Sequence, residues 1–186
     1  VYTDLKFFET HFKGVMPLEI VIDTKKKQGV TRNLRNLEGI DSLSKYIAAI
    51  PGIARPLSVA EGLKFARQAF FDGDPASYTL PNSYDLPALA QYLSFKDTTT
   101  QKNSLNKLVG SFMDQNKQQA RISVSMADIG SYRLPGLLDS IQQKADSIFN
   151  EGKDKKLDIE LTGTSVTFLE GSRFIINGLK ESIFWA

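Results

Sequence analysis

The stretch Gln119-Ala120-Arg121-Ile122-Ser123-Val124-Ser125-Met126-Ala127 alternates between apolar and polar side chains. Successive side chains of a β-strand point to opposite faces of a sheet, so this alternation predicts a strand with one buried face. A helical pattern follows over 131–150, because its apolar residues recur every three or four positions. A shorter alternating stretch covers 157–161. The second half of the chain therefore predicts a β-α-β unit.

The first half repeats this order. Residues 16–23 predict a strand with Leu18, Ile20 and Ile22 on one face, and 33–50 predict a helix that ends at Pro51-Gly52. A short strand is expected over 53–59, where Pro56 indicates an edge position or an irregular strand. A short amphipathic helix over 4–12 precedes the first strand.

The middle of the chain, residues 60–104, departs from this pattern and is interpreted as a mostly helical insertion. Helices are expected over 60–71 and 87–95, separated by a turn at 72–75. Aromatic side chains gather in this insertion. Core packing explains most of them, and the functional alternative is an apolar cleft for a lipophilic substrate, lined by Phe65, Phe70, Phe71, Tyr78 and Tyr84.

Two β-α-β units predict the α+β class, specifically a ferredoxin-like split β-α-β sandwich with helices on one face of an antiparallel sheet. We expect one domain overall. Its parts are 1–59 (the first half, with the N-terminal helix), 60–104 (the insertion), 105–165 (the second half) and 166–186 (a C-terminal helix).

The C-terminal helix becomes more apolar toward its end, which reads Ile183-Phe184-Trp185-Ala186 and includes the single Trp of the chain. Trp is enriched where a bilayer meets water. One interpretation is a helix docked on the core. The other is a helix that leads to a transmembrane segment, with Phe184 and Trp185 at the membrane interface. No stretch within the 186 residues approaches the apolar length that spans a bilayer.

The composition argues against several other functions. The formal net charge is only +2, which gives no electrostatic reason to expect a nucleic acid partner. The absence of Cys and the single histidine, His11, leave no typical zinc site and no supported Ser-His-Asp or Cys-His nucleophile. No glycine-rich phosphate loop occurs. The sequence therefore predicts no enzyme, no metal and no cofactor.

Several segments, in order along the whole chain, resemble the periplasmic loops of the RND superfamily of bacterial exporters. They resemble most the MMPL and patched-like branch, which is related to the mycobacterial lipid transporters. The residues that carry the resemblance are Tyr2-Thr3-Asp4-Leu5-Lys6-Phe7-Phe8-Glu9, Gly14-Val15-Met16-Pro17-Leu18-Glu19-Ile20-Val21-Ile22-Asp23-Thr24, Arg55-Pro56-Leu57-Ser58-Val59, Ala120-Arg121-Ile122-Ser123-Val124-Ser125-Met126-Ala127-Asp128 and Leu161-Thr162-Gly163-Thr164-Ser165-Val166.

The resemblance implies a periplasmic porter domain of a proton-driven efflux transporter that moves lipophilic substrates. The parent protein would lie in the bacterial inner membrane, with this loop on the periplasmic face. Its partners would be the remaining transmembrane and periplasmic parts of the same transporter and a lipophilic small molecule or lipid, and the parent could form a homo-oligomer. The acidic proton-relay residues of this superfamily lie in transmembrane helices, so none is carried over to this chain.

Two other functions share the expected fold. A free-standing ferredoxin-like module could bind a ligand or a protein. An RNA-binding module would have the same element order, but it needs stacking aromatic residues on its sheet. The strand at 119–127 carries none. Because fold alone does not decide function, the C-terminal helix and the order of the motifs favour the porter domain.

Overall fold

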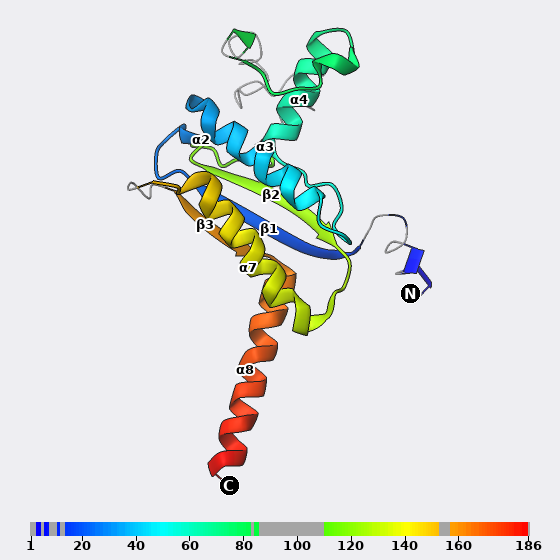
Figure 1. Cartoon of the computed structure of the whole chain (residues 1–186), viewed down its shortest axis with the longest axis vertical. Coiled ribbons are helices and arrows are strands. Elements are labelled where there is room, and N and C mark those ends of the chain that lie inside the picture. Colours follow the sequence, from blue (N-terminus) through cyan, green and yellow to red (C-terminus); the bar gives the residue numbers. More distant parts are fainter. Residues whose placement is uncertain are drawn as a thin grey trace.

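The computed structural model describes residues 3, 4, 6, 7, 11, 14–82, 84, 85, 110–152 and 157–185. Over these residues the chain is mixed α+β, with a three-stranded antiparallel sheet and five α-helices (Figure 1). The strands are β1 (Met16–Asp23), β2 (Gln119–Met126) and β3 (Asp158–Thr162). The predicted α+β class and these three strands are thus confirmed, with β3 displaced by one residue at each end.

The sheet has the order β2-β1-β3, so the first strand in the sequence lies in the centre. Ile20 of β1 lies opposite Ile122 of β2 on one side and Leu161 of β3 on the other. This register places the apolar residues of β1 and β2 on one face, where they are buried. The alternation in the sequence therefore defines a single core-facing side of the sheet.

Two helices cover this face: α3 (Leu34–Ala48) and α7 (Gly130–Phe149), which run side by side in front of the strands in Figure 1. Both were predicted from their apolar spacing, and both are confirmed. Gly39 of α3 is required by their contact, because a Cβ at this position would lie only 2.5 Å from Cε1 of the Phe149 ring. The absent side chain leaves room for an aromatic ring between the two helices.

The segment 53–59, predicted as a short strand that is irregular or at an edge, forms no regular strand. Only isolated bridges form here, from Ile53 to Met126 and from Leu57 to Ser123, both antiparallel to β2. The amides of Ala54 and Leu57 donate to Ser125 and Ser123. Between these two hydrogen bonds the segment advances by three residues while β2 advances by two, so the pairing is irregular. Pro56 occupies the interruption, where its missing N–H breaks no ladder bond.

Beyond this segment the chain forms α4 (Val59–Phe70) and a short 3-10 turn, η1 (Pro75–Ser77), which confirms the first predicted helix of the insertion. The second, over 87–95, lies outside the described residues. A one-turn helix, α2 (Gly29–Arg32), precedes α3.

The last helix, α8 (Thr164–Trp185), starts at the end of β3 and projects away from the sheet, opposite to α4 (Figure 1). Gly163 makes the turn between β3 and α8 with φ +106°, a conformation that favours glycine. Ser165 and Leu169 are the buried residues of α8. Only the first two turns of α8 are therefore packed on the sheet.

Candidate functional site

The aromatic residues proposed as a substrate cleft lie on α4 and in the segment that follows it. Phe65, Phe70 and Phe71 are about half exposed, and Tyr84 is almost fully exposed. The rings of Phe70 and Phe71 meet edge to face, with centroids 5.3 Å apart. Tyr78 instead contacts charged side chains. The structure therefore brings two of the five together, and the cleft itself stays a prediction.

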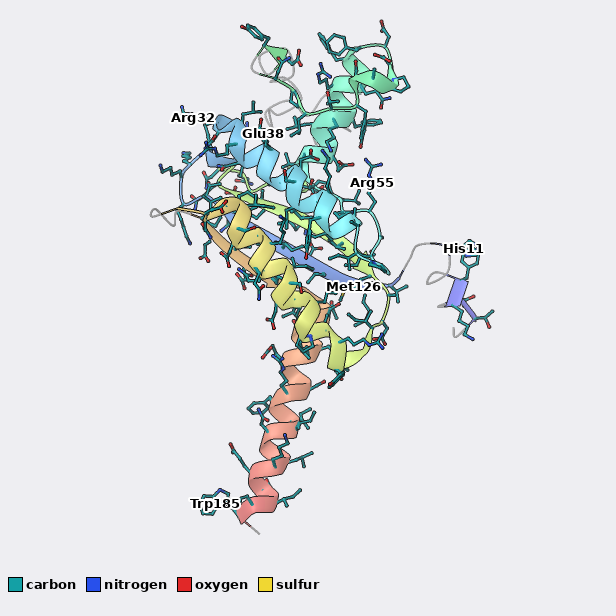
Figure 2. All side chains as sticks on the ribbon, viewed as in Figure 1. His11, Arg32, Glu38, Arg55, Met126 and Trp185 are labelled. Atoms are coloured by element: carbon teal, nitrogen blue, oxygen red, sulfur yellow. The ribbon has the colours of Figure 1, made fainter. Side chains whose placement is uncertain are left out.

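Tyr78 belongs to a cluster of charged side chains between α3 and α4, here called the α3–α4 cluster: Asp41, Arg55, Glu61, Lys64 and Tyr78. Lys64 lies at its centre, with only 8% of its side chain exposed, and donates hydrogen bonds to Asp41 and to Glu61 (2.8 Å). Arg55 and the Tyr78 hydroxyl both donate to the second carboxylate oxygen of Glu61, at 2.5 and 2.8 Å. Figure 2 labels Arg55 beside α3 and α4.

Hydrogen bonds within the α3–α4 cluster stabilise the charged forms of Lys64 and Glu61. Burial alone would lower the pKa of Lys64, but hydrogen bonds to Asp41 and Glu61 outweigh it, so the pKa lies above its ordinary value. Burial would likewise raise the pKa of Glu61, but hydrogen bonds from Lys64 and Tyr78 leave it below the ordinary value. Each charge of the cluster has an opposite partner. The arrangement therefore acts as a clamp between two helices and leaves no group poised for acid–base chemistry.

The same helix fixes the segment that follows it. Arg67 donates to Asp85 (2.8 Å), to the Ser77 carbonyl (3.2 Å) and to the Thr79 hydroxyl (2.6 Å). The hydrogen bond from Arg67 lowers the pKa of Asp85, which keeps this carboxylate charged. Neither the α3–α4 cluster nor the hydrogen bonds of Arg67 were predicted from the sequence. The Glu61–Lys64 spacing of three residues was a signal for an ion pair on a helix, but nothing in the sequence placed Asp41 beside it.

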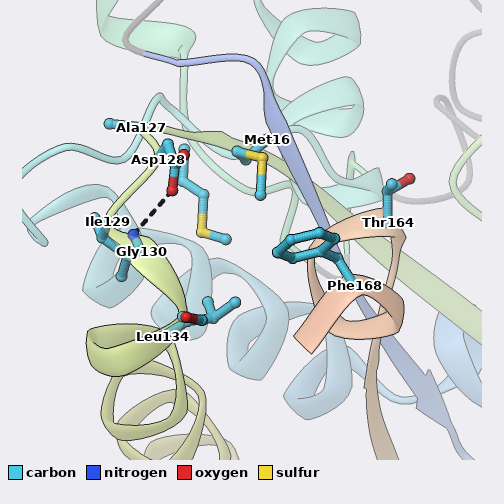
Figure 3. A pocket seen from close by; sticks show the side chains of 10 residues that line it. Met16, Ala127, Asp128, Ile129, Gly130, Leu134, Thr164 and Phe168 are labelled. Carbon is cyan, nitrogen blue, oxygen red and sulfur yellow. Dashed lines mark hydrogen bonds between the residues drawn. The ribbon is translucent and has the colours of Figure 1, made fainter. Parts of the chain in front are cut away.

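A separate apolar hollow of about 210 Å³ lies at the other end of the sheet (Figure 3). Its walls come from the start of β1, the end of β2 and the first turns of α7 and α8. Its apolar lining consists of Met16, Met126, Ala127, Ile129, Leu134 and Phe168. Figure 3 shows Met16, Leu134 and Phe168 around the hollow. At its rim the Asp128 carboxylate accepts a hydrogen bond from the Gly130 amide (2.9 Å). The hollow was not predicted, because each wall reads in the sequence as an ordinary core face.

Along its length α8 exposes large apolar side chains. They are Phe168, Phe174, Ile175, Ile176, Leu179, Ile183, Phe184 and Trp185. Phe184 and Trp185, the predicted membrane-interface residues, lie at the far tip of the helix, and Trp185 is 83% exposed (Figure 2). Within the part of the chain that the structure describes, no helix combines the length and the apolarity needed to cross a membrane.

His11 lies away from the sheet in Figure 2. Its Nδ1 is 2.8 Å from the Phe7 carbonyl, and its ring stacks on the Phe7 ring at 4.1 Å. Among the described residues, no three His, Asp or Glu side chains are placed to hold a metal ion.

Comparison with known proteins places this chain in no established group. No model of a known protein family matches the sequence, and no curated protein is significantly similar to it. Within the described residues, three features stand out on the molecule: the α3–α4 cluster, the apolar hollow and the exposed part of α8.

Proposed function

We propose that this chain is a periplasmic porter domain of a proton-driven RND-type efflux transporter that moves lipophilic substrates. The observation that carries the proposal is α8, a helix of 22 residues whose apolar side chains are left exposed where it projects from the sheet. At 1.5 Å per residue it is about 33 Å long. Such a helix is suited to connect a folded domain to a membrane.

The spacing of the exposed apolar residues supports this role. Leu169 is buried on the sheet, and beyond the polar Ser172 and Arg173 the same face of the helix continues as an apolar stripe of Ile176, Leu179 and Ile183. Covering each of these side chains would contribute roughly 1.5–3 kcal/mol. We therefore expect a bilayer, or apolar helices of the same parent protein, to cover the stripe.

The strand order is consistent with the proposed ferredoxin-like porter fold. The segment 53–57 bridges to β2 at the side away from β1, which gives the spatial order β3, β1, β2 and then 53–57. In chain order this is fourth, first, third and second, as a split β-α-β fold requires. The second strand is reduced to isolated bridges. Support for the fold is therefore strongest in the other three strands.

The proposal has a direct genetic test. We expect the reading frame of the parent gene to encode an apolar run of about 20 residues directly after Ala186 and another shortly before Val1. Acidic residues within its membrane spans would add support for proton-driven transport. A stop codon near Ala186, or polar sequence on both sides, would favour a free-standing ferredoxin-like ligand- or protein-binding module instead.

A physical test uses Trp185, the single Trp of the chain. We expect its fluorescence to shift to shorter wavelength when phospholipid vesicles are added, because the tip of α8 enters the interface. Replacing Ile176, Leu179 and Ile183 together by Ser should remove most of this shift. Replacing the exposed Phe65 and Phe70 of α4 by Ser is the matched control and should leave it unchanged. An equal loss in both variants would argue against α8 as the membrane contact.

The predicted aromatic cleft has its own test in the parent transporter. We expect Phe70→Ser with Phe71→Ser to abolish transport of a lipophilic dye without unfolding the domain, because both side chains are already partly exposed. Full transport by this folded variant would remove the cleft from the proposal. It would leave the role of α8 unaffected.

A further inference from the structure

We propose that the apolar hollow beside the root of α8 binds one uncharged apolar molecule, such as a single substituted ring or a short hydrocarbon chain. The hollow shares no lining residue with α4 and its aromatic residues, and α4 and α8 project from opposite sides of the sheet (Figure 1). Ligand sites are typically concave, mostly apolar and bordered by a few polar groups. This hollow fits that description.

The volume of the hollow sets the size of the ligand. Its 210 Å³ exceeds the roughly 150 Å³ of an engineered cavity that stays dry and binds benzene. A water molecule needs two to four polar partners to be held in such a space. Polar side chains contribute to the lining through Asp128, Ser131 and Thr164, but most of the lining surface is apolar, so an apolar molecule is the better occupant of the interior.

The lining can adapt to the shape of a ligand. Two of the apolar lining residues are methionines, whose unbranched, polarisable side chains fill irregular spaces and contact aromatic rings favourably. Phe168 forms a third wall from α8 and is 62% exposed, so its ring can move without disturbing the core. The site thus combines a fixed floor, built from buried Met126 and Leu134, with one movable side.

The charge at the rim selects among apolar ligands. The Asp128 carboxylate, which accepts a hydrogen bond from the Gly130 amide, lies at the mouth of the hollow (Figure 3). A carboxylate on the ligand would meet this like charge in a site of low polarity. We therefore expect toluene to bind better than benzoate, which has the same ring.

The position of the hollow gives the site a role that rests on the proposed function. Thr164 and Phe168, in the first turns of α8, line the hollow, so it lies at the end of the sheet from which α8 projects. If α8 leads to the membrane, a lipophilic molecule that leaves the bilayer reaches this hollow before it reaches α4. The hollow would then be the first receiving site for the substrate.

The methionines provide the measurement. The chain has three, of which Met16 and Met126 line the hollow, while Met113 lies in a different depression beside Ala120. In the chain labelled with ¹³C-methyl methionine, we expect added toluene to shift the Met16 and Met126 signals saturably. The Met113 signal should stay in place. Equal shifts of all three signals, or none, would overturn the site.

Two phenylalanines of α8 provide matched variants. Phe168→Ala removes a wall of the hollow and should weaken toluene binding at least about tenfold, because the ligand loses its apolar contact with the aromatic ring. Phe174→Ala removes the same side chain from an exposed position outside the hollow and should leave binding unchanged. An unshifted Met113 signal reports that each variant is folded.

Should Phe168→Ala disturb the fold, Ser131→Trp at the exposed rim would fill the mouth and should weaken binding in the same way. Equal affinity in wild type and Ser131→Trp would contradict the proposal. Because toluene binding needs no membrane, its failure alongside intact vesicle binding would remove only this site. Intact toluene binding without vesicle binding would remove only the membrane role of α8.

Discussion

The helices α4 and α8 leave the same sheet at opposite ends, and they are attached by different chemistry. On α4, apolar residues such as Leu63 are fully buried, and Lys64 and Arg67 bind carboxylates on other segments. On α8, Ser165 and Leu169 are the buried residues, and most of the apolar surface is exposed. The charged side chains and the buried stripe of α4 thus have partners within the described residues, whereas the apolar side chains of α8 beyond Leu169 are left exposed there.

This difference separates two uses of a helix. A helix fixed by a buried stripe and paired charges contributes to the stability of its own domain. A helix that keeps its apolar residues exposed contributes little to that stability and is suited to bind another surface. Substitutions should therefore have opposite consequences on the two helices: loss of stability on α4, and loss of binding with little loss of stability on α8.

The largest effect is expected from Leu63→Ala on α4. Leu63 is completely buried, so the substitution removes apolar contacts and leaves a cavity. We expect the free energy of unfolding, measured in urea by circular dichroism, to fall by about 3 kcal/mol. Phe65→Ala on the exposed face of the same helix should change it by less than about 1 kcal/mol. Equal losses would show that the two faces of α4 are not distinguished as described.

A smaller loss, about 2 kcal/mol, is expected from Lys64→Met, because Asp41 and Glu61 lose a buried partner. Asp41 and Glu61 keep Lys45 and Arg55, which limits the effect. The control is Lys45→Met: its side chain is 72% exposed, and such ion pairs contribute at most about 1 kcal/mol. If Lys64→Met were as stable as the wild type, the α3–α4 cluster would not hold α4.

The pH dependence should separate α4 from the rest of the fold. The pKa of Glu61 lies below the ordinary 4.5, so its pairing contributes stability above about pH 4.5 that is lost as the pH falls through the folded value. The raised pKa of Lys64 means that its contribution is present below 10.5 and is lost at still higher pH. Amide exchange in α4 should therefore accelerate more than in α7 under acid, once corrected for intrinsic rates.

Glu61→Gln is the control for this acid effect, because it removes the titrating group at Glu61. In that variant the difference between α4 and α7 should depend less on pH. An unchanged pH dependence would assign the effect to another carboxylate, such as Asp85, whose pKa is also lowered by its hydrogen bond with Arg67.

The smallest effect on stability is expected from Ile176→Ser, Leu179→Ser and Ile183→Ser combined. All three side chains are largely exposed, so we expect the free energy of unfolding to change by less than about 1 kcal/mol in total. This loss is smaller than that from Leu63→Ala alone, although more apolar atoms are removed. A loss of several kcal/mol would mean that the stripe on α8 is already covered within the chain.

The sequence predicted the elements that carry a clear period. The alternation around Ile20 and Ile122 and the three- and four-residue spacing around Ile40 and Ile141 each depend only on neighbouring residues, and all four elements are present. In the segment 53–59, Pro56 indicated an edge position or an irregular strand, and only isolated bridges to β2 form there. How Pro56 affects this segment depends on the strand that lies alongside, and a local sequence pattern does not reveal that strand.

The candidate sites were harder to predict, because they depend on residues far apart in the chain. Asp41 and Lys64 are 23 positions apart, and each alone reads as a solvated charge. Met16, Met126, Leu134 and Phe168 come from four different elements and form a hollow only once the fold brings them together. The exposed end of α8, by contrast, was visible as a rise in apolar content along a single helix.

The position of β3 at the end of the sheet has a consequence for self-association. Its outer side is paired with no strand among the described residues, and such an edge can recruit a second copy of the same chain. Two copies of β3 paired antiparallel about their centre would place Glu160 directly opposite Glu160, and like charges in that position repel. The central carboxylate therefore opposes the symmetric addition of strands into fibres while leaving the edge open to a partner with a basic residue at that place.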